Sequence, residues 1–143
     1  MKILLDMQAI IKIINDSSDI DNAIKNDVEF FQHHFLVSVV TLQEFVILKS
    51  LGKIDTKYSL DEFVEELHSK QIELLTITQK HLSQLEKLPY LDVIDLKTNK
   101  KITHTDPFDR LLIAQAENEN LTIATTDAKF KYYPSLKIID VSK

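Results

Sequence analysis

The chain has 143 residues, 44% of them hydrophobic, which is enough to bury a core, and we expect one domain over residues 1–143. It has no cysteine, which excludes disulfides and thiolate metal sites, and its single glycine excludes the glycine-rich loops that bind dinucleotides or nucleoside triphosphates. The net charge of −5 argues against a protein that binds nucleic acid through a generally basic surface.

The first half of the chain predicts two strands and four helices. Short apolar runs predict buried strands at residues 2–6 and 35–39. Apolar residues at helical spacing predict helices over residues 8–15, 20–31, 41–51 and 60–69. Gly52 follows the third of these helices, at the position where a helix end favours a left-handed residue.

The second half continues the alternation of strands and helices. A strand is predicted at residues 72–77 and a helix at 78–88, which Pro89 ends. Residues 90–105 form a long polar connection, and connections of this length are often functional. A helix at residues 107–119 and strands at 121–124 and 137–141 complete the chain.

This alternation predicts an α/β fold, with a central parallel sheet of four to five strands and helices on both faces. In such sheets ligands bind beyond the carboxyl ends of the strands. Asp6 and Asp127 come directly after predicted strands, while Glu44 and Asp109 lie in the first turns of predicted helices. We therefore expect these four acids to lie at one edge of the sheet.

Each acid also has a purely local interpretation. Asp6 can cap the helix that follows it, and Thr41 to Glu44 matches a capping box. Asp106 can cap the helix at 107–119, with Pro107 at its first position and Asp109 near the positive end of its dipole. Asp127 can be a turn residue. Taken singly, each acid is better explained by its local role.

The convergence of all four acids favours chemistry instead. Carboxylates that lie this close repel one another, so such a cluster is typical of a cage for a hard cation. Oxygen-only ligands indicate Mg²⁺, with Mn²⁺ as the alternative, rather than zinc. The sequence thus predicts that Asp6, Glu44, Asp109 and Asp127 are both metal ligands and catalytic residues.

At this point the sequence resembles a known family, the PIN-domain toxins of the VapC type. The resemblance rests on five ordered segments, of which the fourth is the most specific: Ile3-Leu-Leu-Asp6, Ser38-Val-Val-Thr-Leu-Gln-Glu44, Lys49-Ser-Leu-Gly-Lys53, His104-Thr-Asp-Pro-Phe-Asp-Arg-Leu-Leu-Ile-Ala-Gln-Ala116 and Thr125-Thr-Asp127. The subgroup indicated is the one with an HxDPFDR segment. The resemblance runs from residue 2 to about residue 133.

The resemblance implies a three-layer α/β/α sandwich and a Mg²⁺-dependent endoribonuclease that cleaves RNA, tRNA among the candidate substrates. It further implies a toxin–antitoxin pair, in which a small antitoxin protein fills an apolar groove, and a homodimer. Asp109 corresponds to the family's third acid. Residues 1–14 are too short and too charged for a membrane span, so we expect a cytoplasmic protein without a membrane partner.

Four further residues are expected to assist the site: Asp106, Arg110, Ser38 and Thr125. Asp106 is expected to be a helix cap or an outer group of the site. Arg110, the only arginine, is a candidate phosphate clamp or a candidate salt bridge at the helix start, with Asp106 as the suggested partner, and we favour the salt bridge. His104 is a candidate proton carrier, but we expect it to pack locally or to lie in the loop before the helix.

The sequence departs from the family in one place and leaves one alternative open. Met7 and Gln8 stand where relatives often have Thr-His after the first acid, which concerns tuning and substrate choice more than the cage. The alternative function is a catalytically inactive PIN-like module that binds another protein. Mg²⁺-dependent stabilisation separates the two.

Overall fold

The computed structural model describes residues 1–14 and 33–141 of the chain. The helix predicted over residues 20–31 lies outside the described residues.

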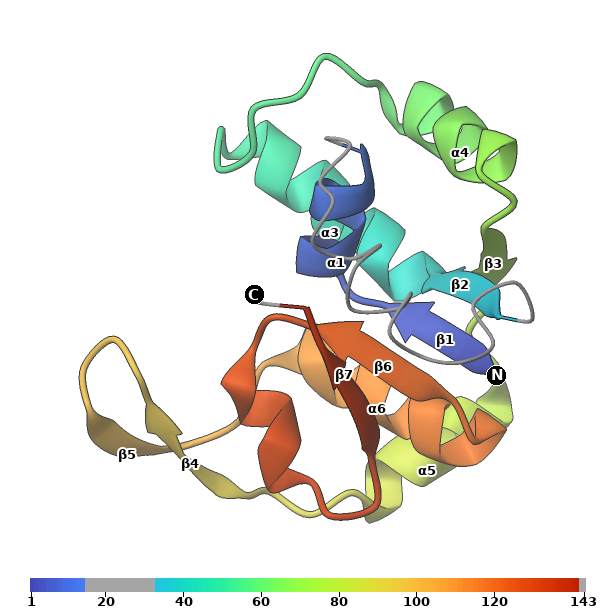
Figure 1. Ribbon diagram of the computed structural model, residues 1–143. Coiled ribbons are helices and arrows are strands. Elements are labelled where there is room, and N and C mark those ends of the chain that lie inside the picture. The colour runs from blue at the N-terminus through green and yellow to red at the C-terminus, as the bar shows by residue number, and fades with distance from the viewer. Residues whose placement is uncertain (15–32, 142–143) are drawn as a thin grey trace.

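A five-stranded parallel sheet forms the centre of the molecule (Figure 1). Its strand order is β3-β2-β1-β6-β7, where the strands are β1 (Lys2–Leu5), β2 (His34–Ser38), β3 (Glu73–Leu75), β6 (Thr122–Thr125) and β7 (Lys137–Asp140). In the register, Leu4 lies opposite Leu36 on one side and Ile123 on the other. The prediction of a parallel sheet with four to five strands is confirmed.

Helices cover both faces of the sheet, as Figure 1 shows. The first face carries α1 (Met7–Ile14), α3 (Val39–Ser50) and α4 (Leu60–Ser69), and the second carries α5 (Gln79–Lys87), α6 (Pro107–Glu119) and the short 3₁₀ helix η2 (Ala128–Tyr132). The α/β fold with helices on either side is therefore confirmed.

Successive side chains of β1 point to opposite faces of the sheet and so contribute to two separate hydrophobic cores. Ile3 and Leu5 are fully buried in the first core, which they share with Phe45 of α3 and Phe63 of α4. Leu4 points the other way, into the core beneath α6. Because both faces of the central strand are buried, the strand is an unbroken apolar run rather than an alternating one, as the sequence indicated.

The segment between α5 and α6 is not the plain connection that the sequence predicted over residues 90–105. It contains an antiparallel hairpin, β4 (Asp92–Asp95) and β5 (Lys100–Thr103), which forms a sheet of its own. Figure 1 shows this hairpin projecting from one end of the molecule. The prediction was wrong because the strands are short and mostly exposed, so they carry no apolar periodicity.

Helix boundaries follow local capping signals. Ser38 caps α3 by accepting a hydrogen bond from the Val40 N–H (3.1 Å), so α3 begins before Thr41 and the predicted Thr41 capping box is wrong. Gly52 has a φ of 67°, which confirms the left-handed position predicted there. Helix α6 begins at Pro107 with Asp106 as its N-cap, as predicted.

In the part of the chain that the structure describes, no helix is long and apolar enough to cross a membrane.

We predict that Ser59→Ala destabilises the protein by about 1 kcal/mol, the usual cost of losing an N-cap. Ser59 and Glu62 form a capping box at the start of α4, with hydrogen bonds of 3.1 Å in each direction. Helix α4 buries Phe63 and Leu67 in the first core, so urea unfolding of the whole domain reports on this cap. Ser69→Ala, at the exposed end of the same helix, is the control and should change stability by less than about 0.5 kcal/mol. Equal effects of the two substitutions would contradict the capping role.

Candidate functional site

The carboxyl ends of the five parallel strands share one edge of the sheet. Asp6 follows β1, the central strand, and Thr125 is the last residue of β6 beside it. The chain leaves β1 toward β2 and β3 on one side and later returns to β6 and β7 on the other. The gap between β1 and β6 is therefore the topological switch point, where α/β sheets bind their ligands.

Asp6 is the most buried acid at this edge, with 6% of its surface exposed. Its Oδ1 accepts a hydrogen bond from the Ala9 N–H (2.9 Å), which is the predicted helix cap, and its Oδ2 accepts one from the Thr125 hydroxyl. The pKa of Asp6 is raised to about 6, chiefly by burial and also by the charges of Asp109 and Asp127. The hydrogen bonds from Thr125 and Ala9 lower it, but by less.

Glu44 lies on α3, in its second turn rather than in the first turn that the sequence predicted, because α3 begins at Val39. Burial, together with the negative charges of Asp109, Asp106 and Asp6, raises the pKa of Glu44 to about 7. Glu44 therefore belongs to the same electrostatic cluster as the acids of the sheet edge.

Asp109 lies in the first turn of α6, as predicted, with its side chain 20% exposed. Burial raises its pKa, the hydrogen bond from His104 lowers it, and the charges of Asp106 and Asp127 raise it again. Asp106 is exposed and caps the helix by accepting from the N–H groups of Phe108 and Asp109, at 2.9 and 3.0 Å. Asp106 thus contributes charge to the cluster from outside it.

Asp127 caps η2, where its Oδ1 accepts from the Lys129 N–H (2.9 Å). Its own N–H donates to the Thr125 hydroxyl oxygen at 3.0 Å. That hydroxyl therefore bridges the two acids, because it donates to Asp6 and accepts from the Asp127 backbone. Thr125, which the sequence named as an assisting residue, lies between Asp6 and Asp127.

The chemistry of this donor set fits a hard divalent cation. The four acids offer only carboxylate oxygens, and repulsion within the cluster contributes to the raised pKa values of Asp6, Glu44 and Asp109. Within residues 1–14 and 33–141, however, no three His, Asp or Glu side chains are arranged to hold one ion. Oxygens of Asp6, Asp109 and Asp127 are turned to the local partners given above. The structure thus brings the charges of these acids close enough to act on one another.

A protein-family model settles the identity of the fold: the model for the PIN domain matches residues 3–136. The chain belongs to the PIN-domain family. The family resemblance inferred from the sequence is confirmed at this level.

Solved structures share this PIN fold over almost their full length. A chain of VapBC2 from Rickettsia felis, crystallised with a DNA fragment from its promoter, has a TM-score of 0.68 and 19% identity, covering 98% of both chains. A chain of VapBC-1 from nontypeable Haemophilus influenzae has a TM-score of 0.66 and 18% identity, covering 100% of both. A chain of a toxin–antitoxin complex from Klebsiella pneumoniae has a TM-score of 0.59 and 16% identity, covering 96% of both. At these identities the similarity is one of fold.

Two curated proteins share a local similarity with the chain. The endoplasmin homologues of Hordeum vulgare and Catharanthus roseus are each 36% identical to it over 72 residues, which is 50% of this chain. The match spans only 8% of the length of those proteins, so it indicates neither family nor activity.

Two of the expected assisting residues have structural roles in this PIN domain. The Ser38 hydroxyl is fully buried and serves as the α3 cap. The Arg110 guanidinium donates to the carbonyl oxygens of Leu88 (2.9 Å) and Pro89 (3.0 Å) and lies 3.8 Å from the centre of the Tyr90 ring. The favoured salt bridge with Asp106 was therefore wrong. Arg110 instead ties the end of α5 to the start of α6.

Sequence reasoning missed a chain of hydrogen bonds behind Asp109. The Nε2 atom of His104 lies 3.1 Å from Asp109 Oδ2, and its Nδ1 lies 2.6 Å from the Tyr133 hydroxyl. Both His104 and Tyr133 are 3% exposed, so this arrangement fixes the ring. The HxDPFDR spacing places His104 five residues before Asp109, but only the fold brings Tyr133 to the other ring nitrogen.

We predict that Glu44→Gln stabilises the protein at pH 7.5 when EDTA removes divalent cations. Asp6 and Glu44 have folded-state pKa values of about 6 and about 7, above the ordinary values of 3.8 and 4.5. Between its ordinary pKa and its raised pKa, each acid binds more protons in the folded than in the unfolded state. The free energy of unfolding therefore falls as the pH rises from about 4 to about 7. Removing the Glu44 charge should make the fall shallower.

Melting temperatures measured between pH 5 and 7.5 in EDTA test this prediction. Glu65→Gln, which removes an exposed acid from α4, is the matched control and should follow the parent. A decline as steep in Glu44→Gln as in the parent would show that Glu44 does not carry the repulsion.

Proposed function

We propose that this PIN domain is a Mg²⁺-dependent endoribonuclease and the toxin of a toxin–antitoxin pair, in the subgroup with an HxDPFDR segment. The observation that carries the proposal is the gathering of Asp6, Glu44, Asp109 and Asp127 at the switch-point edge, with raised pKa values at the first three. Acids with perturbed pKa values cluster at functional sites, because a stable domain has no need to bury mutually repelling charges.

The residues divide the work in a way that the geometry supports. Asp6, Asp109 and Asp127, with Glu44, would hold Mg²⁺, which when bound supplies Lewis-acid activation of water and of the phosphodiester. Glu44, whose charge is coupled to those of Asp6 and Asp109, is also a candidate to accept a proton from the attacking water. Thr125 orients Asp6, and His104 orients Asp109.

Substituting Asp109→Asn or Asp6→Asn should reduce RNA cleavage by at least about 100-fold, the usual effect of losing a positioned acid or base. Cleavage of tRNA and other structured RNAs is measured by gel electrophoresis with Mg²⁺, with Mn²⁺ and with EDTA. The parent should cleave only with a divalent ion. Asp61→Asn, an exposed acid on α4, is the control and should retain activity. Full activity in either site variant would refute the proposed site.

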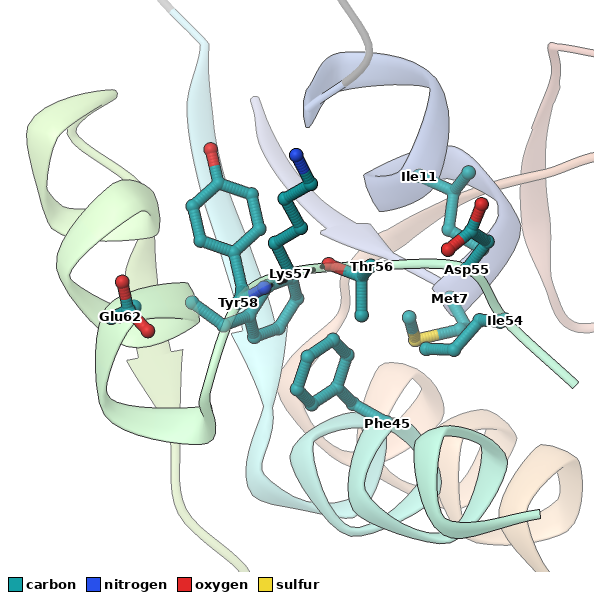
Figure 2. Close-up of a pocket in the computed structure, with 10 residues that line it drawn as sticks. Met7, Ile11, Phe45, Ile54, Asp55, Thr56, Lys57, Tyr58 and Glu62 are labelled. Atoms are coloured by element: carbon teal, nitrogen blue, oxygen red, sulfur yellow. Dashed lines mark hydrogen bonds between the residues drawn. The ribbon is translucent and has the colours of Figure 1, made fainter. Parts of the chain in front are cut away.

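An apolar groove beside the acids is suited to the antitoxin. It has a volume of about 640 Å³ and lies between α1, α3, α4 and residues 54–58 (Figure 2). Its apolar lining is Met7, Ile11, Phe45, Ile54 and Phe63, and charged residues such as Asp55, Lys57 and Glu62 border it. Met7 and Phe45 directly follow Asp6 and Glu44 in the chain. A helical segment in this groove could therefore place a cationic side chain among the acids.

We predict that Ile54→Glu prevents inhibition by the antitoxin without reducing RNA cleavage. The antitoxin candidate is the product of a small open reading frame adjacent to the gene, co-expressed with this chain. A buried carboxylate in the groove opposes docking of an apolar helix face. Leu82→Glu, on an exposed position of α5, is the control and should remain inhibited. Inhibition that is equal in both variants would place the antitoxin elsewhere.

The second candidate function is a PIN-like module that binds a protein and has lost catalysis. The same apolar groove favours it, since docking there needs no metal. A catalytic domain should be stabilised by Mg²⁺, whereas a binding module should not. The proposal of a homodimer follows from the family resemblance, and sedimentation of the free chain tests it.

A further inference from the structure

The β4–β5 hairpin stands beside the acidic cluster and lies outside the central sheet. It leads directly into the segment that carries His104, Asp106 and Asp109. Its tip faces the residues that follow β6 across a groove of about 280 Å³. The hairpin wall includes Ile94, Asp95, Leu96 and Lys97, and the opposite wall includes Asp127 and Lys129. One of the proposed metal ligands therefore lines this groove.

Specific contacts hold the hairpin in this position. The Ile94 N–H donates to the Tyr132 hydroxyl (3.2 Å), and the His104 N–H donates to the Leu91 carbonyl (2.8 Å). The hydroxyl of the adjacent Tyr133 lies 2.6 Å from His104 Nδ1, just after β5. The η2 helix therefore has Asp127 as its N-cap at one end and contacts the hairpin through Tyr132 at the other.

The charges on the groove suit an anionic chain that approaches the cluster from outside. Lys131 and Lys101 are paired with Asp140 (2.7 Å) and Asp92 (3.7 Å). Lys97 and Lys129, by contrast, have no carboxylate within salt-bridge distance among the described residues. The Asp95 carboxylate in the same wall accepts a hydrogen bond from the backbone N–H of Lys97 (3.0 Å), not from its ammonium group. The two lysine ammonium groups are therefore available to a ligand.

The tip of the hairpin also carries an exposed apolar side chain. Leu96, which lines the groove with Asp95 and Lys97, is 75% exposed and belongs to neither core cluster. Exposed apolar side chains beside unpaired lysines match a single nucleic-acid strand, which offers phosphates to the lysines and base faces to the apolar group.

We infer that this groove binds the RNA strand beside the scissile phosphate, with Lys97 and Lys129 on the backbone and Leu96 against a base. The inference rests on the proposed nuclease function and assigns to the hairpin the binding of substrate outside the acidic cluster. A protein partner is better matched to the apolar groove of Figure 2, on α1, α3 and α4.

Binding of a fluorescein-labelled single-stranded RNA to the full chain tests the inference. Fluorescence anisotropy is measured with Mg²⁺ in an Asp109→Asn background, where the RNA stays intact. Lys97→Ala and Lys129→Ala should each weaken binding and lower the slope of log K against log salt by about 0.7, the value for one phosphate contact on a single strand. Leu96→Ser should weaken binding without changing that slope.

Matched lysine controls are available on α5. Lys80 and Lys87 line a separate groove with Gln84 and Asn118, and Lys80→Ala and Lys87→Ala should leave RNA affinity unchanged. Equal losses in both lysine pairs would indicate general charge attraction and overturn the inference. Unchanged binding in Lys97→Ala and Lys129→Ala, or no RNA binding by the parent, would also overturn it.

A small phosphodiester separates failure of this inference from failure of the proposed function. Bis(p-nitrophenyl) phosphate reaches the acids without spanning the groove. The Lys97→Ala, Lys129→Ala and Leu96→Ser variants should hydrolyse it at the parent's rate, while their KM for RNA rises. If the parent hydrolyses neither substrate, the nuclease proposal fails. If the three variants hydrolyse both substrates as the parent does, the groove does not bind RNA, and the proposed nuclease function still stands.

Discussion

The buried carboxylate of Asp6 at the end of the central strand is the constraint around which this edge of the sheet is organised. Its oxygens accept from the Ala9 N–H and the Thr125 hydroxyl, yet burial and the charges of Asp109 and Asp127 still raise its pKa to about 6. A lone buried acid could be neutralised by one proton. A group of mutually repelling acids is satisfied better by a divalent cation, because the ion reduces the charge of all of them together.

Capping and catalysis are not competing explanations of these acids. Asp6 and Asp127 each accept a backbone N–H with one oxygen and lie within electrostatic reach of Asp109. A short polar side chain that caps a helix is held in a fixed rotamer at the strand end, which is also where a ligand approaches an α/β sheet. The caps thus position the proposed ligands before any ion binds. Two other caps stay outside the cluster. Ser38 is buried and its hydroxyl caps α3, while Asp106 is exposed and caps α6.

The acidic edge is flanked by two surfaces of different character. The apolar groove lies beside Met7 and Phe45, the residues that follow two of the acids, and it suits a helix from another protein. The hairpin groove includes Asp127 together with two unpaired lysines, and it suits a polyanion. A chain with a net charge of −5 can act on RNA if some of its lysines lie where the strand enters the site, because their charge then acts locally on the phosphates. Substrate and inhibitor would then approach the same acids from different elements.

The sequence by itself determined the elements whose signals are local. Pro107 after Asp106 marks the start of α6, Gly52 marks the end of α3, and apolar runs mark the strands of the parallel sheet. Strand–helix alternation was enough to place the four acids at one edge, because parallel strands share their carboxyl ends. Only the tertiary structure decided the rest. The hairpin in residues 90–105, the carbonyl partners of Arg110 and the pairing of Tyr133 with His104 all join residues distant in sequence, or strands too short and exposed to show a period. Such contacts depend on how elements pack against each other, and no local pattern encodes that packing.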